Sequence, residues 1–168
     1  SEHVFAFLEL AKRQGLKKVM VHAILDGRDT LYNSGLEFIR LLSAKMREIG
    51  VGRIASLSGR YYAMDRDDHW DRTGRAYNTM LGRAKVNSNI EAIFKTGYDL
   101  VHSDEFLETT TIKPEFGIKD NDALIFYAFG YVAANDPLRK PFDDRSLADA
   151  GIADQNRIIF RAPREHLN

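Results

Sequence analysis

The sequence predicts an α/β fold: a largely parallel sheet flanked by helices, in a single domain of 168 residues. Short apolar runs alternate with segments in which apolar residues recur every three or four positions, which is typical of strands alternating with helices. The first strand, 18–25, is apolar at nearly every position, as expected of a strand buried on both faces. Both strong strands of the first half run into polar loops that contain glycine.

The first half of the chain holds two predicted helices and two predicted strands. The spacing of Val4, Phe7, Leu8 and Ala11 predicts a helix over 3–14. After the first strand, Asn33 or Ser34 is a candidate N-cap for a helix that ends at Gly50. The second strand begins at Val51 and breaks at Gly59.

Further along, shorter elements are predicted. Asp67 and Asp68 open a helix that closes at Gly82, since acidic residues suit the positive end of a helix dipole. Trp70 is interpreted as the core anchor of that helix. Asn87 or Ser88 starts a short helix that ends near Gly97, and further elements are expected as an edge strand at 106–112, a strand at 123–129, a short helix at 143–150 and a strand at 157–161.

The bulk composition excludes several classes of function. The 24 basic residues balance the 24 acidic ones, which argues against nucleic acid or a membrane surface as a partner. The absence of cysteine excludes a disulfide framework and a thiolate nucleophile. There is no apolar run of about 18 residues and no visible signal peptide, so a cytoplasmic location is expected.

The polar loops after the first two strands form the candidate site. A right-handed crossover would place both strands in one sheet, and ligands of such sheets bind outside the carboxyl ends of the strands. The loop at 26–30 carries Arg28 and Asp29, and the loop that begins at Gly59 carries Arg60 and Arg66. Guanidinium groups suit carboxylate and phosphate, so we expect the two loops to hold one small anion.

Each of these residues also has a purely structural interpretation. The arginines can pair with aspartates of the same loops, at positions 26, 29, 65 and 67. Asp29 can accept a hydrogen bond from a substrate hydroxyl or act as a base, or it can be a helix N-cap or part of an Asx turn; Asp26 fits the turn better. His22, inside an apolar strand, is interpreted as a packed histidine.

The sequence shows no evident nucleophile or metal centre of its own. It lacks a G-x-S-x-G elbow, a Walker loop and a G-x-G-x-x-G motif. The acidic run at 65–71 lacks the glycine and final glutamate of an EF-hand loop, and it is interpreted as a charged helix start.

Three long strings resemble the cofactor-independent phosphoglycerate mutases: HAILDGRDT at 22–30, SGRYYAMDRDDHWDR at 58–72 and KDNDALIFYAF at 119–129. The resemblance covers 1–129 and leaves 130–168 as a divergent tail. It implies the inserted phosphotransferase domain, in which Arg28, Asp29, Arg60 and Arg66 bind 2- and 3-phosphoglycerate and Asp29 handles hydroxyl protons.

The resemblance also implies what this chain lacks. Two manganese ions and a serine nucleophile belong to a separate phosphatase-like domain, so no cofactor is expected in this chain and that domain is its expected partner. A substrate-binding histidine of the family has no counterpart before residue 1. The family's N-F-R-P-D-R string, with two more substrate arginines, is replaced at 128–133 by AFGYVA; Arg139 lies nearby.

Three hypotheses follow. The chain is the substrate-binding part of a phosphoglycerate mutase, inactive by itself; or it is a diverged or rebuilt stand-alone domain with at most weak anion binding; or it is an interaction module that uses another surface.

Overall fold

The structure is a computed structural model that describes residues 2–127 and 157–163. It confirms the α/β class. In chain order the elements are α1 (Glu2–Arg13), β1 (Met20–Leu25), α2 (Gly35–Ile49), β2 (Arg53–Gly59), α3 (Arg60–Ala63), α4 (Trp70–Met80), α5 (Ile90–Val101), β3 (Thr110–Thr111), the 3-10 helix η1 (Pro114–Phe116), β4 (Asp122–Tyr127) and β5 (Arg157–Pro163).

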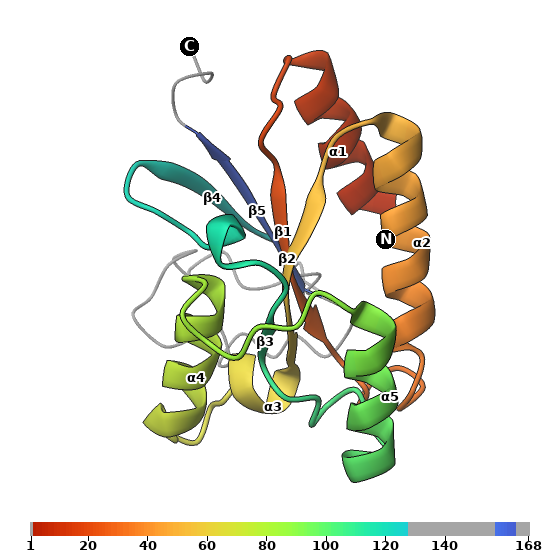
Figure 1. Cartoon of the computed structure of the whole chain (residues 1–168), viewed down its shortest axis with the longest axis vertical. Coiled ribbons are helices and arrows are strands. Elements are labelled where there is room, and N and C mark those ends of the chain that lie inside the picture. Colours follow the sequence, from red (N-terminus) through yellow and green to blue (C-terminus); the bar gives the residue numbers. More distant parts are fainter. Residues whose placement is uncertain (1, 128–156, 164–168) are drawn as a thin grey trace, which may run out of the picture.

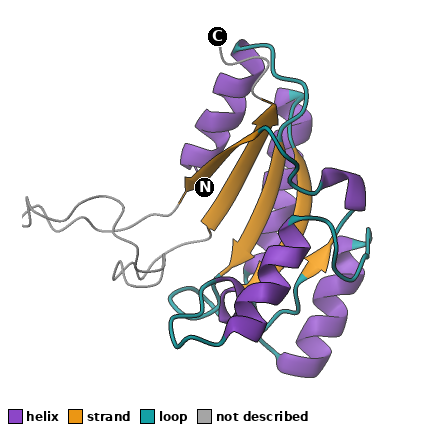
Figure 2. Cartoon of the chain, turned by 90° about the vertical axis from the view of Figure 1, so that its left-hand side faces the viewer, coloured by secondary structure: helices purple, strands orange, loops and turns teal. Residues whose placement is uncertain are grey.

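The described strands form one twisted sheet in the order β3-β2-β1-β5-β4 (Figure 2). β1 and β2 are parallel, as predicted. The other neighbouring pairs are antiparallel, so the expectation of a largely parallel sheet is wrong for the sheet as a whole. The reason lies in the connections. α2 supplies the crossover that a parallel pair requires, whereas the chain enters β3 from the end of the sheet at which β2 finishes.

The register between β1 and β2 contains one irregularity that preserves the two faces of the sheet. Val21 pairs with Ile54, but the next residue, His22, pairs with Ser56, so Ala55 is the extra residue of a bulge. His22 Nδ1 and Ser56 Oγ lie 2.8 Å apart in a hydrogen bond, and His22 is 1% exposed. The interpretation of His22 as a packed histidine is confirmed.

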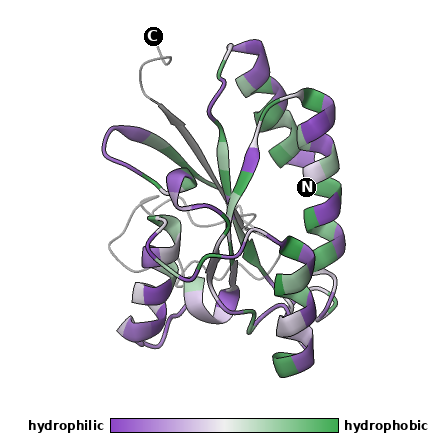
Figure 3. Cartoon of the chain, in the orientation of Figure 1, coloured by the Kyte–Doolittle hydropathy of each residue, from purple (hydrophilic) through white to green (hydrophobic). Residues whose placement is uncertain are grey.

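The main core lies between β1, β2 and the helices α1, α2 and α5, which Figure 1 shows on one side of these strands, with α3 and α4 on the other. Mixed colours along α1 and α2 in Figure 3 fit helices with one buried side. The buried members include Val4, Leu8, Val21, Leu25, Ile39, Leu42, Met46, Leu57, Phe94 and Leu107.

The two ends of α2 are capped in different ways. At its carboxyl end Gly50 adopts a left-handed conformation with φ of 81°, and its N–H donates to the Met46 carbonyl, which confirms the predicted end. At its start Ser34 occupies the N-cap position without a side-chain capping bond. The Gly35 N–H instead donates to Asp104 Oδ2 at 2.7 Å, across 69 residues of sequence.

Two aromatic and glycine interpretations are wrong. Trp70 is 75% exposed, because α4 buries only Ala76 and Thr79 and Trp70 lies at its first turn. Gly97 lies inside α5 rather than at its end, and a Cβ there would meet Leu107 Cδ1 at 2.2 Å. Gly97 therefore makes room for a core leucine.

Other boundaries also differ from the expected ones. α3 was not predicted, and α4 starts after Asp68, whose φ of 59° is incompatible with a helix. α5 follows Asn89, whose side chain accepts the Ala92 N–H. The predicted edge strand shrinks to β3, the strand at 123–129 is present through residue 127, and β5 matches its prediction. The expected helix at 143–150 lies outside the described residues.

Within the described ranges, every helix is too short or too polar to span a lipid bilayer.

Candidate functional site

The carboxyl ends of β1 and β2 lie side by side. The parallel ladder runs to the pair Leu25 and Gly59, which are the last residues of the two strands. Asp26 and Arg60 follow directly and begin the two polar loops. The predicted juxtaposition of the loops is therefore present, and it depends on the one parallel pair in the described sheet.

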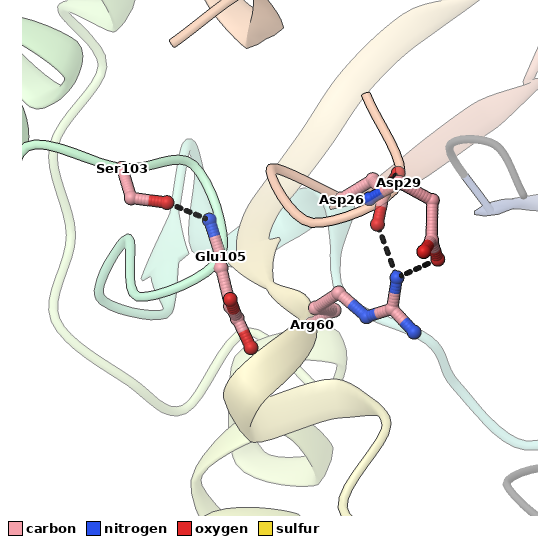
Figure 4. A network of polar contacts seen from close by, with 5 residues as sticks. All are labelled: Asp26, Asp29, Arg60, Ser103 and Glu105. Atoms are coloured by element: carbon pink, nitrogen blue, oxygen red, sulfur yellow. Dashed lines mark hydrogen bonds and ion pairs between the residues drawn. The ribbon is translucent and has the colours of Figure 1, made fainter. Parts of the chain in front are cut away.

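Arg60 joins the two loops (Figure 4). Its Nη1 donates to Asp26 Oδ1 and, at 2.6 Å, to Asp29 Oδ2. The side chains of Arg60 and Asp26 are only 15% and 5% exposed, and that of Asp29 is 29% exposed. The purely structural interpretation, an arginine paired with local aspartates, is thus correct for Arg60 in this structure.

The charge of Arg60 is secured by these partners. Burial by itself disfavours the charged guanidinium, but the hydrogen bonds to Asp29 and Asp26 outweigh it, and the pKa of Arg60 is raised. Figure 4 shows the guanidinium reaching toward the two aspartates and away from Glu105. The site therefore contains a fixed cation with two fixed carboxylates.

The loop after β1 is held by its own side chain. The Asp29 N–H donates to Asp26 Oδ2 at 3.2 Å, which confirms the turn interpretation of Asp26. Asp29 Oδ2 bonds Arg60, whereas Asp29 Oδ1 makes no hydrogen bond within the described part of the chain. One oxygen of Asp29 is thus anchored and the other can accept a donor.

Arg28 and Arg66 are exposed. Neither makes a hydrogen bond or ion pair with any residue in 2–127 or 157–163, so the structure places them on the two loops without bringing them into contact. Their roles in binding stay predictions.

Sequence reasoning missed the segment 103–107, which supports both loops. The Glu105 carbonyl accepts the Tyr61 N–H at 3.1 Å, and the Leu107 carbonyl accepts the Gly59 N–H at 2.9 Å. The only sequence signal was the pair of glycines that end or follow the strands, Gly27 and Gly59, since glycine often marks a close approach of backbone.

Asp65 organises the loop between α3 and α4, which was also missed. Its side chain is 3% exposed and accepts from Arg72 Nη1 at 3.1 Å and from the backbone N–H of His69 at 2.8 Å. Burial disfavours its charge, but these backbone bonds and the nearby cations leave its pKa lowered. The Arg72 guanidinium also lies 4.0 Å from the Tyr61 ring centroid.

One trio in the described chain has metal-ligand types close together: Asp65, Asp67 and His69, with ligand atoms within 4.8 Å of one another. Asp65 is already committed to Arg72 and to the loop backbone. The trio therefore does not fit the two-manganese centre that the family implies, and we interpret it as a capped helix start.

The fold and the loops define a class: an α/β domain with an arginine-centred polar site at the ends of two parallel strands. The family profile described as BPG-independent PGAM N-terminus matches residues 1–131. This chain belongs to that family.

Individual relatives agree with this assignment. The 2,3-bisphosphoglycerate-independent phosphoglycerate mutase of Staphylococcus saprophyticus is 47% identical over 161 residues, which cover 95% of this chain and 32% of that protein. That of Clostridium perfringens is 52% identical over 134 residues, 76% of this chain and 26% of that protein. The chain thus spans about a third or less of the relatives it matches.

A solved structure shows the same fold. The chain is similar to Leishmania mexicana phosphoglycerate mutase with a TM-score of 0.65 and 26% sequence identity, over 71% of this chain and 24% of that one. The family profile ends at residue 131, whereas the Staphylococcus match covers 95% of the chain and so extends beyond it. The predicted divergence of 130–168, and the single-domain organisation, stay predictions.

Proposed function

We propose that this chain is the substrate-binding, phosphotransferase part of an isomerase of glycolysis that interconverts 2- and 3-phosphoglycerate, located in the cytoplasm. In this proposal it works with a phosphatase-like domain that supplies a serine nucleophile and two manganese ions. Manganese would supply Lewis-acid stabilisation of phosphoryl oxygens. The residues of this chain bind and orient the substrate, and they do not turn it over alone.

The observation that carries the proposal is the way Arg60 is held. A guanidinium has five N–H donors, and only Nη1 is engaged by Asp26 and Asp29. The edge formed by Nε and Nη2 makes no hydrogen bond with a described residue.

The same molecule shows what such an edge can bind. Arg40 uses Nε and Nη2 to bind both oxygens of Glu91, at 2.7 and 2.5 Å. Arg60 can present the same bidentate fork to the carboxylate or phosphate of phosphoglycerate, with the rest of its guanidinium already fixed. Less side-chain freedom is then lost on binding, which favours affinity.

Asp29 is the residue we assign to the glycerate hydroxyl. Its anchored oxygen keeps the carboxylate beside Arg60, and the other oxygen can accept the hydroxyl hydrogen and so handle its proton during phosphoryl transfer. Arg28 and Arg66, exposed on the same two loops, would add charge from either side of the substrate. Closure of the partner domain over this arrangement would exclude water.

A second candidate is a stand-alone domain with at most weak anion binding and no catalysis. The internal pairing of Arg60 favours it, because two carboxylates beside the guanidinium partly cancel the attraction for an anionic ligand.

Calorimetric titration with 3-phosphoglycerate separates the two. We expect the chain to bind, and Arg60→Ala to weaken binding at least about 10-fold, since hydrogen bonds to charged groups contribute about 1.5–3 kcal/mol. Arg66→Ala should weaken it less, because Arg66 is exposed. Arg40→Ala removes the same charge from a helix surface and should leave affinity unchanged. Equal affinity in all three variants would exclude the proposed site.

Turnover gives the complementary test. With manganese and the phosphatase-like domain of a relative, the chain should support conversion of 3-phosphoglycerate to 2-phosphoglycerate, and the pure chain should not. Conversion by the pure chain would contradict the division of labour proposed here.

A further inference from the structure

A single peptide lies against both strand-end loops. A Cβ on Gly59 would lie 2.3 Å from the Glu105 carbonyl oxygen, and a Cβ on Gly27 would lie 2.4 Å from the Glu105 nitrogen. Together with the Tyr61 N–H bond to the Glu105 carbonyl, these approaches place the Glu105 backbone against the starts of both loops. Its position therefore constrains how the loop of Asp29 lies relative to that of Arg60.

The neighbouring residue, Asp104, anchors this peptide to the rest of the fold. Its side-chain oxygens accept the Gly35 N–H and the Tyr98 hydroxyl, each at 2.7 Å. Its own N–H donates to the Tyr32 carbonyl at 2.7 Å. Asp104 thus joins the segment 103–107 to the start of α2, to α5 and to the loop that follows β1.

The environment of Asp104 is unusual for a carboxylate. It is 1% exposed, and no lysine or arginine in the described part of the chain pairs with it. Burial raises its pKa and the nearby Asp26 raises it further, whereas the bonds from Tyr98 and Gly35 oppose the shift. Its compensation comes from two donors and from the positive end of the α2 dipole. A buried acid held only in this way is destabilising unless its donors stay in place.

We propose that Asp104 is a positioning residue for the phosphoglycerate site: it anchors the 103–107 segment, and the Glu105 peptide in turn sets the placement of Asp29 and Arg60. The nature of the ligand rests on the function proposed above. The positioning itself does not, because it can be measured in the ligand-free protein.

The test uses isotope-labelled chain and three variants. Asp104→Asn removes the charge, and Tyr98→Phe removes one donor while keeping the ring beside Phe94, 5.6 Å away between centroids. Asp99→Asn is the matched control, since it makes the same chemical change on an exposed position of α5. The readouts are the NMR signals of the Arg60 Nε–H and the Asp29 amide without ligand, and then the affinity for 3-phosphoglycerate.

We expect Asp104→Asn to shift both signals and to weaken 3-phosphoglycerate binding about 10-fold, which corresponds to about 1.4 kcal/mol. Tyr98→Phe should shift the signals in the same direction by less, and Asp99→Asn should shift neither. Val4→Ala, which removes core packing in α1, controls for general destabilisation: it should lower the melting temperature and leave both signals in place.

Unchanged Arg60 and Asp29 signals in folded Asp104→Asn and Tyr98→Phe would overturn the proposal, and so would an equal shift in Val4→Ala. If Asp104→Asn does not fold, Tyr98→Phe decides alone. Shifted signals in a chain that binds no 3-phosphoglycerate would support the positioning role and reject the proposed function.

Discussion

Arg60 and Arg40 make the two long-range arginine–aspartate or arginine–glutamate contacts that best reveal the difference between the site and the surface of this domain. Arg40 joins α2 to Glu91 of α5 with side chains that are 60% and 56% exposed. Arg60 joins the ends of β1 and β2 with a side chain that is 15% exposed. The residue types are alike, but the surroundings differ.

The difference is one of stoichiometry as well as burial. Arg40 spends two nitrogens on one carboxylate, so both groups are satisfied. Arg60 divides one nitrogen between two carboxylates, so donors remain on the arginine and an acceptor remains on Asp29. An ion pair with unused capacity on a buried, fixed frame is suited to binding, whereas a fully matched exposed pair is not.

The largest effect should come from removing the backbone support of the Arg60 pair. In Gly59→Ala the new methyl group would meet the Glu105 carbonyl at 2.3 Å, and because the obstacle is backbone the loops must move. We expect a loss of about 3 kcal/mol in the free energy of unfolding, measured by urea denaturation.

Gly74→Ala is the matched control for this substitution. Gly74 lies inside α4, and a methyl group added there would meet nothing within 4 Å beyond its own stretch of helix. Alanine should therefore stabilise the helix by about 0.5–1 kcal/mol. A neutral Gly59→Ala variant would show that the 103–107 segment does not constrain the loops.

The next effect sharpens the comparison directly. Arg60→Ala leaves the buried Asp26 carboxylate without its cation, and we expect a loss of about 2 kcal/mol in unfolding free energy. Arg40→Ala exposes Glu91 to water that already reaches it, so no resolvable change is expected. Equal losses in the two variants, measured by urea denaturation, would show that the Arg60 pair is an ordinary surface contact.

Sequence reasoning found one of these two regions, and only half of its structure. The repeated construction of a strand, a glycine and an arginine predicted that Arg60 would lie beside the loop of Asp29, because consecutive parallel strands end at the same edge. The class and the parallel pair followed from local pattern. The antiparallel strands did not, because strand direction depends on where α5 delivers the chain.

What could not be predicted was the support from a distance. Asp104 caps α2 from 69 residues away and Arg72 closes the Asp65 loop, and neither leaves a periodic signal. Trp70 was wrongly placed in the core for a related reason: its size favours burial, but the short α4 turns only two residues inward. Side-chain contacts between distant segments are decided by the tertiary fold rather than by spacing.

The smallest expected effect contrasts the acids of the two regions by their pH dependence. The pKa of Glu91 is lowered, first by its hydrogen bond from Arg40, so its contribution to stability is present above its ordinary value of 4.5 and is lost as pH falls through the lowered folded value. The pKa of Asp104 is raised above 3.8, first by burial, so the folded state binds its proton more readily than the unfolded one. Stability from Asp104 therefore rises as pH falls through its folded value. Relative to the native chain, Glu91→Gln should lose stability least at low pH, and Asp104→Asn should lose most there. Melting temperatures measured from pH 7 to pH 3 test both signs, and parallel curves for the two variants would show that the carboxylate near the strand ends is no different from the one on the helix surface.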